Sequence, residues 1–173
     1  MSDPRYPIGK IVLTGSLPPL ARAEAIARVA TIPNDLYQAV RGLQQDQLDT
    51  PYRTGGWTLR QVVHHIADSH VNAYVRHKLT ITEANPPIKA YDETRWAELA
   101  DAKGPIGPSL LLIQSIHERW VHCLRSLPDE AFARTCVHSE NGKMTLDDLL
   151  ATYAWHGTHH VAHITTLRST KGW

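Results

Sequence analysis

The chain has 173 residues, and its 18 lysines and arginines nearly balance 17 aspartates and glutamates, for a formal net charge of +1. This length predicts a single domain over residues 1–173, with its core at about 18–170. A near-neutral charge gives no reason to expect nucleic acid or an anionic membrane as a partner. No apolar run is long enough to span a bilayer, and residues 1–10 lack the apolar stretch of a secretory signal, so we expect a cytoplasmic protein.

Proline and glycine divide the first half of the chain into helical segments and loops. Residues 21–44 follow a helical pattern, and Pro33 predicts a kink or short break within it, because proline removes a backbone hydrogen bond. Residues 49–57 read as a loop from their proline and glycine content. From Thr58 to about Glu83 neither residue type occurs, which predicts a long helix.

The second half of the chain begins with an extended stretch at 85–93, because residues before proline avoid the helical region. A short helix is expected at 93–102 and a long one at 110–127, with Ser109 as its N-cap and Pro128 beyond its end. Residues 139–145 read as a turn that could join two short strands.

The last long helix is expected after Thr145, its N-cap, with Asp147 and Asp148 in its first turn and Gly172 beyond its end. The chain thus has four long helices and a long crossover between the second and third. This pattern predicts an all-α fold, a four-helix bundle.

Four of the eleven histidines lie on this last helix. At about 100° per residue, its apolar residues gather on one side: Leu146, Leu149, Leu150, Tyr153, Gly157, Val161, Ile164 and Leu167. His160 falls inside this stripe and His156 lies at its edge. His163 sits slightly further round, whereas His159 points well away and is expected to be solvated. His156 and His160 are four residues apart, so their rings can converge on one atom.

A lone histidine on an apolar face is more often a hydrogen-bonded core residue than a metal ligand. Two buried imidazoles at this spacing leave several polar atoms to satisfy, which favours a metal site. Gly157 stands where the zinc protease motif HExxH has glutamate, so a third ligand is needed from elsewhere. On the second helix His70 and His77 fall near the middle of the apolar side, His65 flanks it and His64 lies nearly opposite. Periodicity alone favours His65 and His70 equally.

Three stretches, TPYRTGGWTLRQVVHHIADSHVNAYVRHKL, NPPIKAYDETRWAEL and YAWHGTHHVAHITTLR, together resemble the DinB-like superfamily, in particular its YfiT branch of metal-dependent hydrolases. The resemblance covers nearly the whole chain from Pro7 onward. In that family a tryptophan starts the second helix and a ligand histidine follows eight residues later. Counting from Trp57, the resemblance implies His65 as a ligand.

The family's last helix carries an HxxxH pair followed, four residues later, by an apolar position. Ile164 fits that position, so the resemblance implies His156 and His160 as the other two ligands. These are the two histidines that the periodicity points inward. His163 stands where many relatives have glutamine, which implies a place beside the ligands or in the pocket.

Three neutral imidazoles without a carboxylate would leave a divalent ion its full charge and an open position. Zinc held by three histidines and a water molecule is a catalytic arrangement, and such an ion lowers the pKa of the water toward about 7 or polarises a carbonyl. We therefore expect one Zn²⁺ per chain, although imidazole also suits Ni²⁺, Co²⁺ and Fe²⁺. The expected activity is metal-dependent hydrolysis of a small-molecule substrate.

No general base is clearly marked in the sequence. Asp68 and the YDE stretch from Tyr91 to Glu93 are candidates if the crossover folds over the site, and Asp68 could equally orient a ligand imidazole or be solvated. Arg76, Lys89 and Trp96 are candidates for lining a pocket that takes an anionic substrate, although most helical arginines and lysines are simply solvated.

Two other function classes fit the same residues. Relatives in the superfamily include thiol transferases, in which zinc activates the thiol of a low-molecular-weight cofactor, and a coordinated thiol is deprotonated outright. A non-enzymatic metal-binding stress-response bundle would hold a metal without an adjacent cavity. The resemblance also implies a homodimer. The two cysteines, Cys123 and Cys136, have no motif spacing and are expected to be reduced structural thiols.

Overall fold

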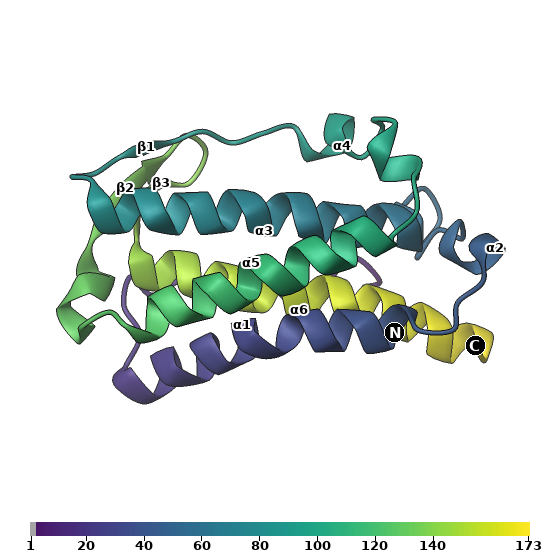
Figure 1. The fold of residues 1–173 in the computed structure, drawn as a ribbon, viewed down its shortest axis with the longest axis horizontal. Helices are drawn as coiled ribbons and strands as arrows, with labels where there is room; N and C mark the ends of the chain where they lie inside the picture. Colours follow the sequence, from purple (N-terminus) through teal and green to yellow (C-terminus); the bar gives the residue numbers. More distant parts are fainter. Residues whose placement is uncertain (1–2) are drawn as a thin grey trace.

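Four long helices pack into a bundle in the computed structural model, which describes residues 3–173 (Figure 1). They are α1 (Pro19–Val40), α3 (Leu59–Thr82), α5 (Gly107–Arg125) and α6 (Leu146–Lys171). Helices α1 and α3 each pack against both α5 and α6, and so occupy opposite corners of the bundle. Helices α1 and α6 run in one direction, and α3 and α5 in the other (Figure 1). The predicted all-α four-helix bundle is confirmed.

The crossover from α3 to α5 runs back along the bundle beside α3 (Figure 1). It carries β1 (Pro87–Ile88), α4 (Glu93–Trp96) and the 3₁₀ turn η1 (Asp101–Lys103). Strand β1 pairs in parallel with β2 (Thr135–His138), which pairs antiparallel with β3 (Gly142–Thr145). The predicted turn between two strands is therefore confirmed. Two short elements complete the fold, α2 (Gln45–Leu48) and the 3₁₀ turn η2 (Asp129–Ala133).

The helix expected over 93–102 is wrong, because only Glu93–Trp96 is α-helical. Asp92 starts this turn by accepting a hydrogen bond from the Arg95 backbone N–H. Trp96 and Leu99 remain 38% and 55% exposed, so this segment buries too little apolar surface to hold a longer helix.

The predicted starts of two long helices are confirmed. Thr58 accepts from the Gln61 backbone N–H, and Thr145 accepts from that of Asp148 in the same way. The prediction for Ser109 is wrong, because α5 begins at Gly107 with a proline in its first turn, where the missing N–H costs no hydrogen bond. The Ser109 hydroxyl lies 2.8 Å from Nδ1 of His64 instead.

Helix α1 continues through Pro33, so of the expected kink or short break the break does not occur. Proline has no N–H to donate to the carbonyl four residues earlier, that of Val29. This carbonyl accepts from Nδ1 of His117 on α5, at 2.7 Å. A partner from another helix therefore satisfies the acceptor that Pro33 leaves unpaired within α1.

Two hydrophobic clusters form the core, one at each end of the bundle. One surrounds Trp120 and Leu149, and the other surrounds Leu59 and Ile164. Along α6 the first cluster ends at Ala154 and the second holds Ile164, so the histidines lie on the stretch between them.

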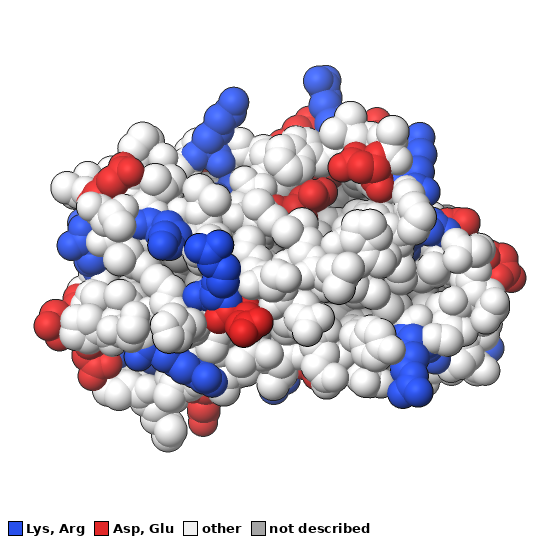
Figure 2. All heavy atoms as spheres, viewed as in Figure 1, with Lys and Arg blue, Asp and Glu red and all other residues white. Residues whose placement is uncertain are grey.

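Charged side chains of both signs are interspersed over the face seen in Figure 2, around a largely uncharged central area. This distribution agrees with the near-neutral net charge. Within residues 3–173, no helix has the length and apolar character that a membrane crossing requires.

Candidate metal centre

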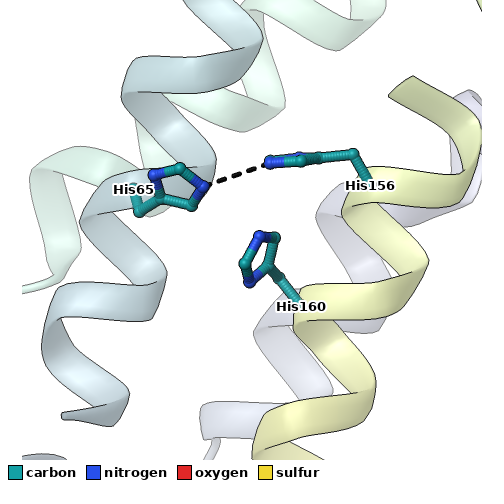
Figure 3. Close-up of side chains that lie close together, drawn as sticks. All are labelled: His65, His156 and His160. Carbon is teal, nitrogen blue, oxygen red and sulfur yellow. Dashed lines mark hydrogen bonds between the residues drawn. The ribbon is translucent and has the colours of Figure 1, made fainter. Parts of the chain in front are cut away.

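His65 on α3 and His156 and His160 on α6 turn their rings toward one another across the interior of the bundle (Figure 3). One ring nitrogen from each lies within 4.8 Å of the other two, and the Nε2 atoms of His65 and His156 are 3.1 Å apart. Two nitrogens bound to one tetrahedral zinc ion are separated by about 3.3 Å. The separation of the His65 and His156 nitrogens is therefore close to what a single ion requires, and the His160 nitrogen lies within 4.8 Å of both.

Trp57, just before the start of α3, packs against the cluster. Its ring centroid lies 4.5 Å from that of His65 and 6.4 Å from that of His160. The first two of these eight residues lead to the start of α3 at Leu59, and the rest make nearly two turns of helix. This spacing places the His65 ring against the indole. The tryptophan-to-histidine spacing thus has a physical reason: the indole restricts the orientation of the imidazoles.

Burial keeps the three histidines neutral. It lowers the pKa of His65 to about 4 from an ordinary 6.5. Burial, followed by the neighbouring histidines, also lowers the pKa of His156 and of His160 well below that value. Metal ions bind the neutral imidazole, so this environment favours the protonation state that ligation needs.

Periodicity left His65 and His70 as equal candidates, and the two lie in different places in the structure. It places His65 in the cluster, whereas His70 lies behind His156, with its Nε2 atom 3.1 Å from Nδ1 of His156. His64 faces away from the cluster, and its ring nitrogens contact Ser109 in the first turn of α5 and the Gly104 carbonyl just before that helix. His77 donates from Nδ1 to the Ala73 carbonyl.

A cavity of about 280 Å³ opens beside the cluster, between α3, α6, the crossover and the β2–β3 turn. All three clustered histidines line it, and its wall also includes Trp57, Ser69, Arg76, Tyr91, Glu93, His138, Glu140, Asn141, Tyr153 and His159. A larger groove of about 920 Å³ lies between α1 and α5, away from the three histidines. The candidate site is the smaller cavity, because the ring nitrogens of the three clustered histidines converge at its wall.

The pocket candidate Arg76 and the general-base candidate Glu93 both line the cavity. The Arg76 guanidinium donates to the Tyr153 hydroxyl and to the Lys89 carbonyl. Partial burial, with repulsion from the carboxylates of Glu140 and Asp92, raises the pKa of Glu93.

Asp68, Trp96 and His163 lie outside the cavity wall. Burial and the nearby Asp101 raise the pKa of Asp68. Trp96 packs on Tyr91, with ring centroids 4.5 Å apart. His163 stacks on Tyr52 at 4.1 Å, beside His160 but turned from the cavity.

The solvated position expected for His159 is wrong, because this residue is only 6% exposed. Its ring stacks on that of Trp155 at 4.4 Å. The Trp155 indole N–H donates to the Gly9 carbonyl, which fixes the N-terminal segment over this face of α6. Helical periodicity describes the faces of the bundle but cannot show a segment that packs outside it.

His159, His160 and His163 form a second group of nitrogens within 4.8 Å of one another.

Sequence reasoning missed the cavity-lining roles of Ser69 and Tyr153, whereas Tyr91 belongs to the YDE stretch that was a candidate for the site. Tyr153 lies on the core face as predicted, and its hydroxyl also meets Arg76 at the cavity. Burial raises the pKa of Tyr91 to about 12, which keeps this phenol protonated. No local signal in the sequence marks Ser69 or Tyr153 as cavity residues, because the crossover and the β2–β3 turn form the cavity wall only in the folded chain.

Comparison with known proteins places the chain among proteins of one family. Residues 28–164 match the DinB superfamily. Proteins from Bacillus mycoides (strain KBAB4) and Bacillus cereus (strain 03BB102) are each 49% identical to it over the full 173 residues of both chains, and both bear the name "Putative metal-dependent hydrolase".

Solved structures agree with this placement. YfiT from Bacillus subtilis, described as "a probable metal-dependent hydrolase with an unusual four-helix bundle topology", superimposes with a TM-score of 0.95 at 45% identity over 98% of each chain. TT2238, a four-helix bundle protein, has a TM-score of 0.54 at 18% identity, over 88% of this chain and 99% of that one, and shares the fold alone. The chain therefore belongs to the DinB superfamily.

Proposed function

We propose that this protein is a metal-dependent hydrolase of a small-molecule substrate, and that His65, His156 and His160 hold one divalent ion, zinc. The observation that carries the proposal is the convergence of three neutral imidazole nitrogens within 4.8 Å at the wall of a cavity. Three protein ligands, fewer than the four of a structural zinc site, leave a position open on the ion. The names of the relatives agree with this activity.

When bound, such an ion acts as a Lewis acid on a substrate carbonyl or on water. The imidazoles add no negative charge, so the full charge of the ion would act on the substrate. The indole of Trp57 and the burial of His65, with His156 and His160 half-buried beside it, hold the ligand nitrogens in place before any ion arrives. This arrangement is pre-organised, which lowers the ordering cost of binding.

Glu93 is the residue that we assign to proton transfer. Its carboxylate lines the same cavity as the three histidines, and its pKa is raised by partial burial. A raised pKa brings a carboxylate nearer the working pH, as a general base requires. Tyr153 lies on the same wall and its hydroxyl oxygen accepts from Arg76, so its O–H remains free to donate to a substrate oxygen.

The cavity beside the cluster favours an enzyme over a non-enzymatic metal-binding bundle, for which no such space is needed. Thiol transfer would use the same donor set, so the test must separate water from thiol as the attacking group. Zinc-loaded protein is assayed with a panel of esters and amides in ¹⁸O-labelled water, and in parallel with low-molecular-weight thiols and an electrophile.

We expect a product that carries ¹⁸O and a rate independent of thiol. His65→Ala should lose this turnover together with the metal, whereas Glu93→Gln should keep the metal and lose about 10²–10⁴-fold in rate. Turnover only with thiol, saturating in thiol concentration, would assign a transferase instead. Full turnover by chelator-stripped protein would overturn both.

A further inference from the structure

A chain of buried imidazoles extends from the cluster to the far side of the bundle. Nδ1 of His156 lies 3.1 Å from Nε2 of His70, and Nδ1 of His70 lies 2.7 Å from Nε2 of His117. Nδ1 of His117 ends the chain 2.7 Å from the Val29 carbonyl oxygen. His70 and His117 are 0% and 1% exposed. Each of the four long helices contributes one group, from α6 through α3 and α5 to α1.

The Val29 carbonyl at the end of this series of imidazoles determines which nitrogen of each ring carries the hydrogen. A carbonyl oxygen only accepts, so Nδ1 of His117 must carry the hydrogen. A neutral imidazole has one N–H, so Nε2 of His117 accepts from Nδ1 of His70. By the same reasoning, Nε2 of His70 accepts from Nδ1 of His156. The Nε2 atom of His156 is thereby left with its lone pair, and this is the atom 3.1 Å from Nε2 of His65.

The acceptor at the end exists because of the sequence of α1. Inside an α-helix the Val29 carbonyl would accept from the N–H of residue 33, and Pro33 has none. The carbonyl therefore needs a donor from outside the helix, and His117 supplies it. Pro33 thus frees the carbonyl on which the imidazole chain ends.

Gly157, the residue after His156, allows the helices to approach at this level. A Cβ at position 157 would lie 2.4 Å from Cδ1 of Ile32 and 3.0 Å from Cε1 of His70. The first distance is closer than real contacts allow, so any side chain here would displace Ile32 on α1 and press on His70. The backbone of α6 is therefore placed where only glycine fits against the imidazole chain.

We infer that His70 and His117 are positioning residues that fix His156 as its Nδ1–H tautomer and so hold the Nε2 lone pair ready for the metal. The inference rests on the proposed function, since it concerns the ligand set of that metal. With the opposite tautomer of His156, one contact in the imidazole chain would bring together either two N–H groups or two lone pairs. Neither combination makes a hydrogen bond. Unpaired buried polar atoms are costly, so the chain favours one tautomer even in the absence of metal.

The test reads the tautomers directly in the metal-free protein, by long-range ¹H–¹⁵N correlation of the histidine rings at neutral pH. His156, His70 and His117 should each show the Nδ1–H form. His117→Phe keeps a flat ring but removes the acceptor from His70, and it should leave His156 with a mixture of tautomers. His117→Gln offers an amide oxygen to His70 and should restore the single form.

Zinc affinity is measured by competition with a chelator in the same variants. His117→Phe should bind about 10–100-fold more weakly than wild type, and His117→Gln should recover most of that loss. His77→Phe is the matched control, because His77 is equally buried on α3, contacts Trp120 and lies outside the chain. It should change neither the tautomer of His156 nor the affinity.

An Nε2–H tautomer of His156 in metal-free wild type would overturn the inference without any variant, so the test survives a variant that fails to fold. Unchanged tautomer and affinity in His117→Phe would overturn it as well. Failure of the proposed function looks different: wild type would bind no zinc, whereas the tautomers of the metal-free protein would still be as described.

Discussion

His77 is a titratable group buried in the core away from the metal cluster, with 1% of its surface exposed. Its Nδ1 donates to the Ala73 carbonyl, and within the described part of the chain its Nε2 has no hydrogen-bond partner. A proton added at Nε2 would place a buried charge without an acceptor. Burial accordingly lowers the pKa of His77 to about 4 from an ordinary 6.5.

This lowered pKa makes the free energy of unfolding depend on pH. Below the ordinary pKa of 6.5 the unfolded chain takes up a proton at His77, whereas the folded protein does not until the pH nears 4. The stability is therefore complete above about pH 7 and falls as the pH drops between these two values. At 1.36 kcal/mol per pH unit, His77 alone lowers the free energy of unfolding by about 2 kcal/mol at about pH 5, relative to its value above about pH 7.

His77→Phe removes the titrating group and keeps an aromatic ring against Trp120. Urea unfolding of the metal-free protein should therefore show a loss of stability between about pH 7.5 and pH 5 that is smaller by about 2 kcal/mol in the variant. His122→Phe, on the exposed surface of α5, controls for the change of residue type and should lose as much as wild type. An equal loss in His77→Phe and wild type would refute the burial argument.

Three further outcomes are expected. Gly157→Ala should lower stability by about 1 kcal/mol in thermal unfolding, because the clash with Ile32 outweighs the higher helix propensity of alanine. Gly107→Ala is the control and should not destabilise the protein, because the space around Gly107 is open. A Gly157→Ala variant more stable than wild type would contradict the close packing. Metal analysis should find His65→Ala stripped of zinc and His64→Ala loaded, and the reverse pattern would reject the ligand assignment. Sedimentation should show the homodimer that the family resemblance implies, and a stable 19.4 kDa species at micromolar concentration would exclude it.

The parts of the fold that the sequence predicted correctly are set by local chemistry. Thr58 and Thr145 start their helices through hydrogen bonds to residues three positions on, and the interaction lies within one turn. The convergence of His156 and His160 is equally local, because residues four apart share a helix face. His65 needed the family resemblance, since periodicity finds a face and not what packs across from it.

The errors at Pro33 and His159 share a physical cause, which is a partner distant in the sequence. Pro33 does not break α1, because His117 satisfies the carbonyl it leaves free. His159 is buried by the N-terminal segment, which helical periodicity does not describe. His70 lies in the core as its apolar face predicts, but it faces His117 and not the cavity. In each case the environment comes from a different element of the folded chain.

The central claim is that one ion lies between His65, His156 and His160. Anomalous diffraction at the zinc edge, from crystals of the zinc-loaded protein, tests it most directly. We predict one peak per chain, about 2.0–2.1 Å from Nε2 of His156 and from one ring nitrogen of each of the other two. A peak within the second group, between His159, His160 and His163, with none at His65, would contradict the account.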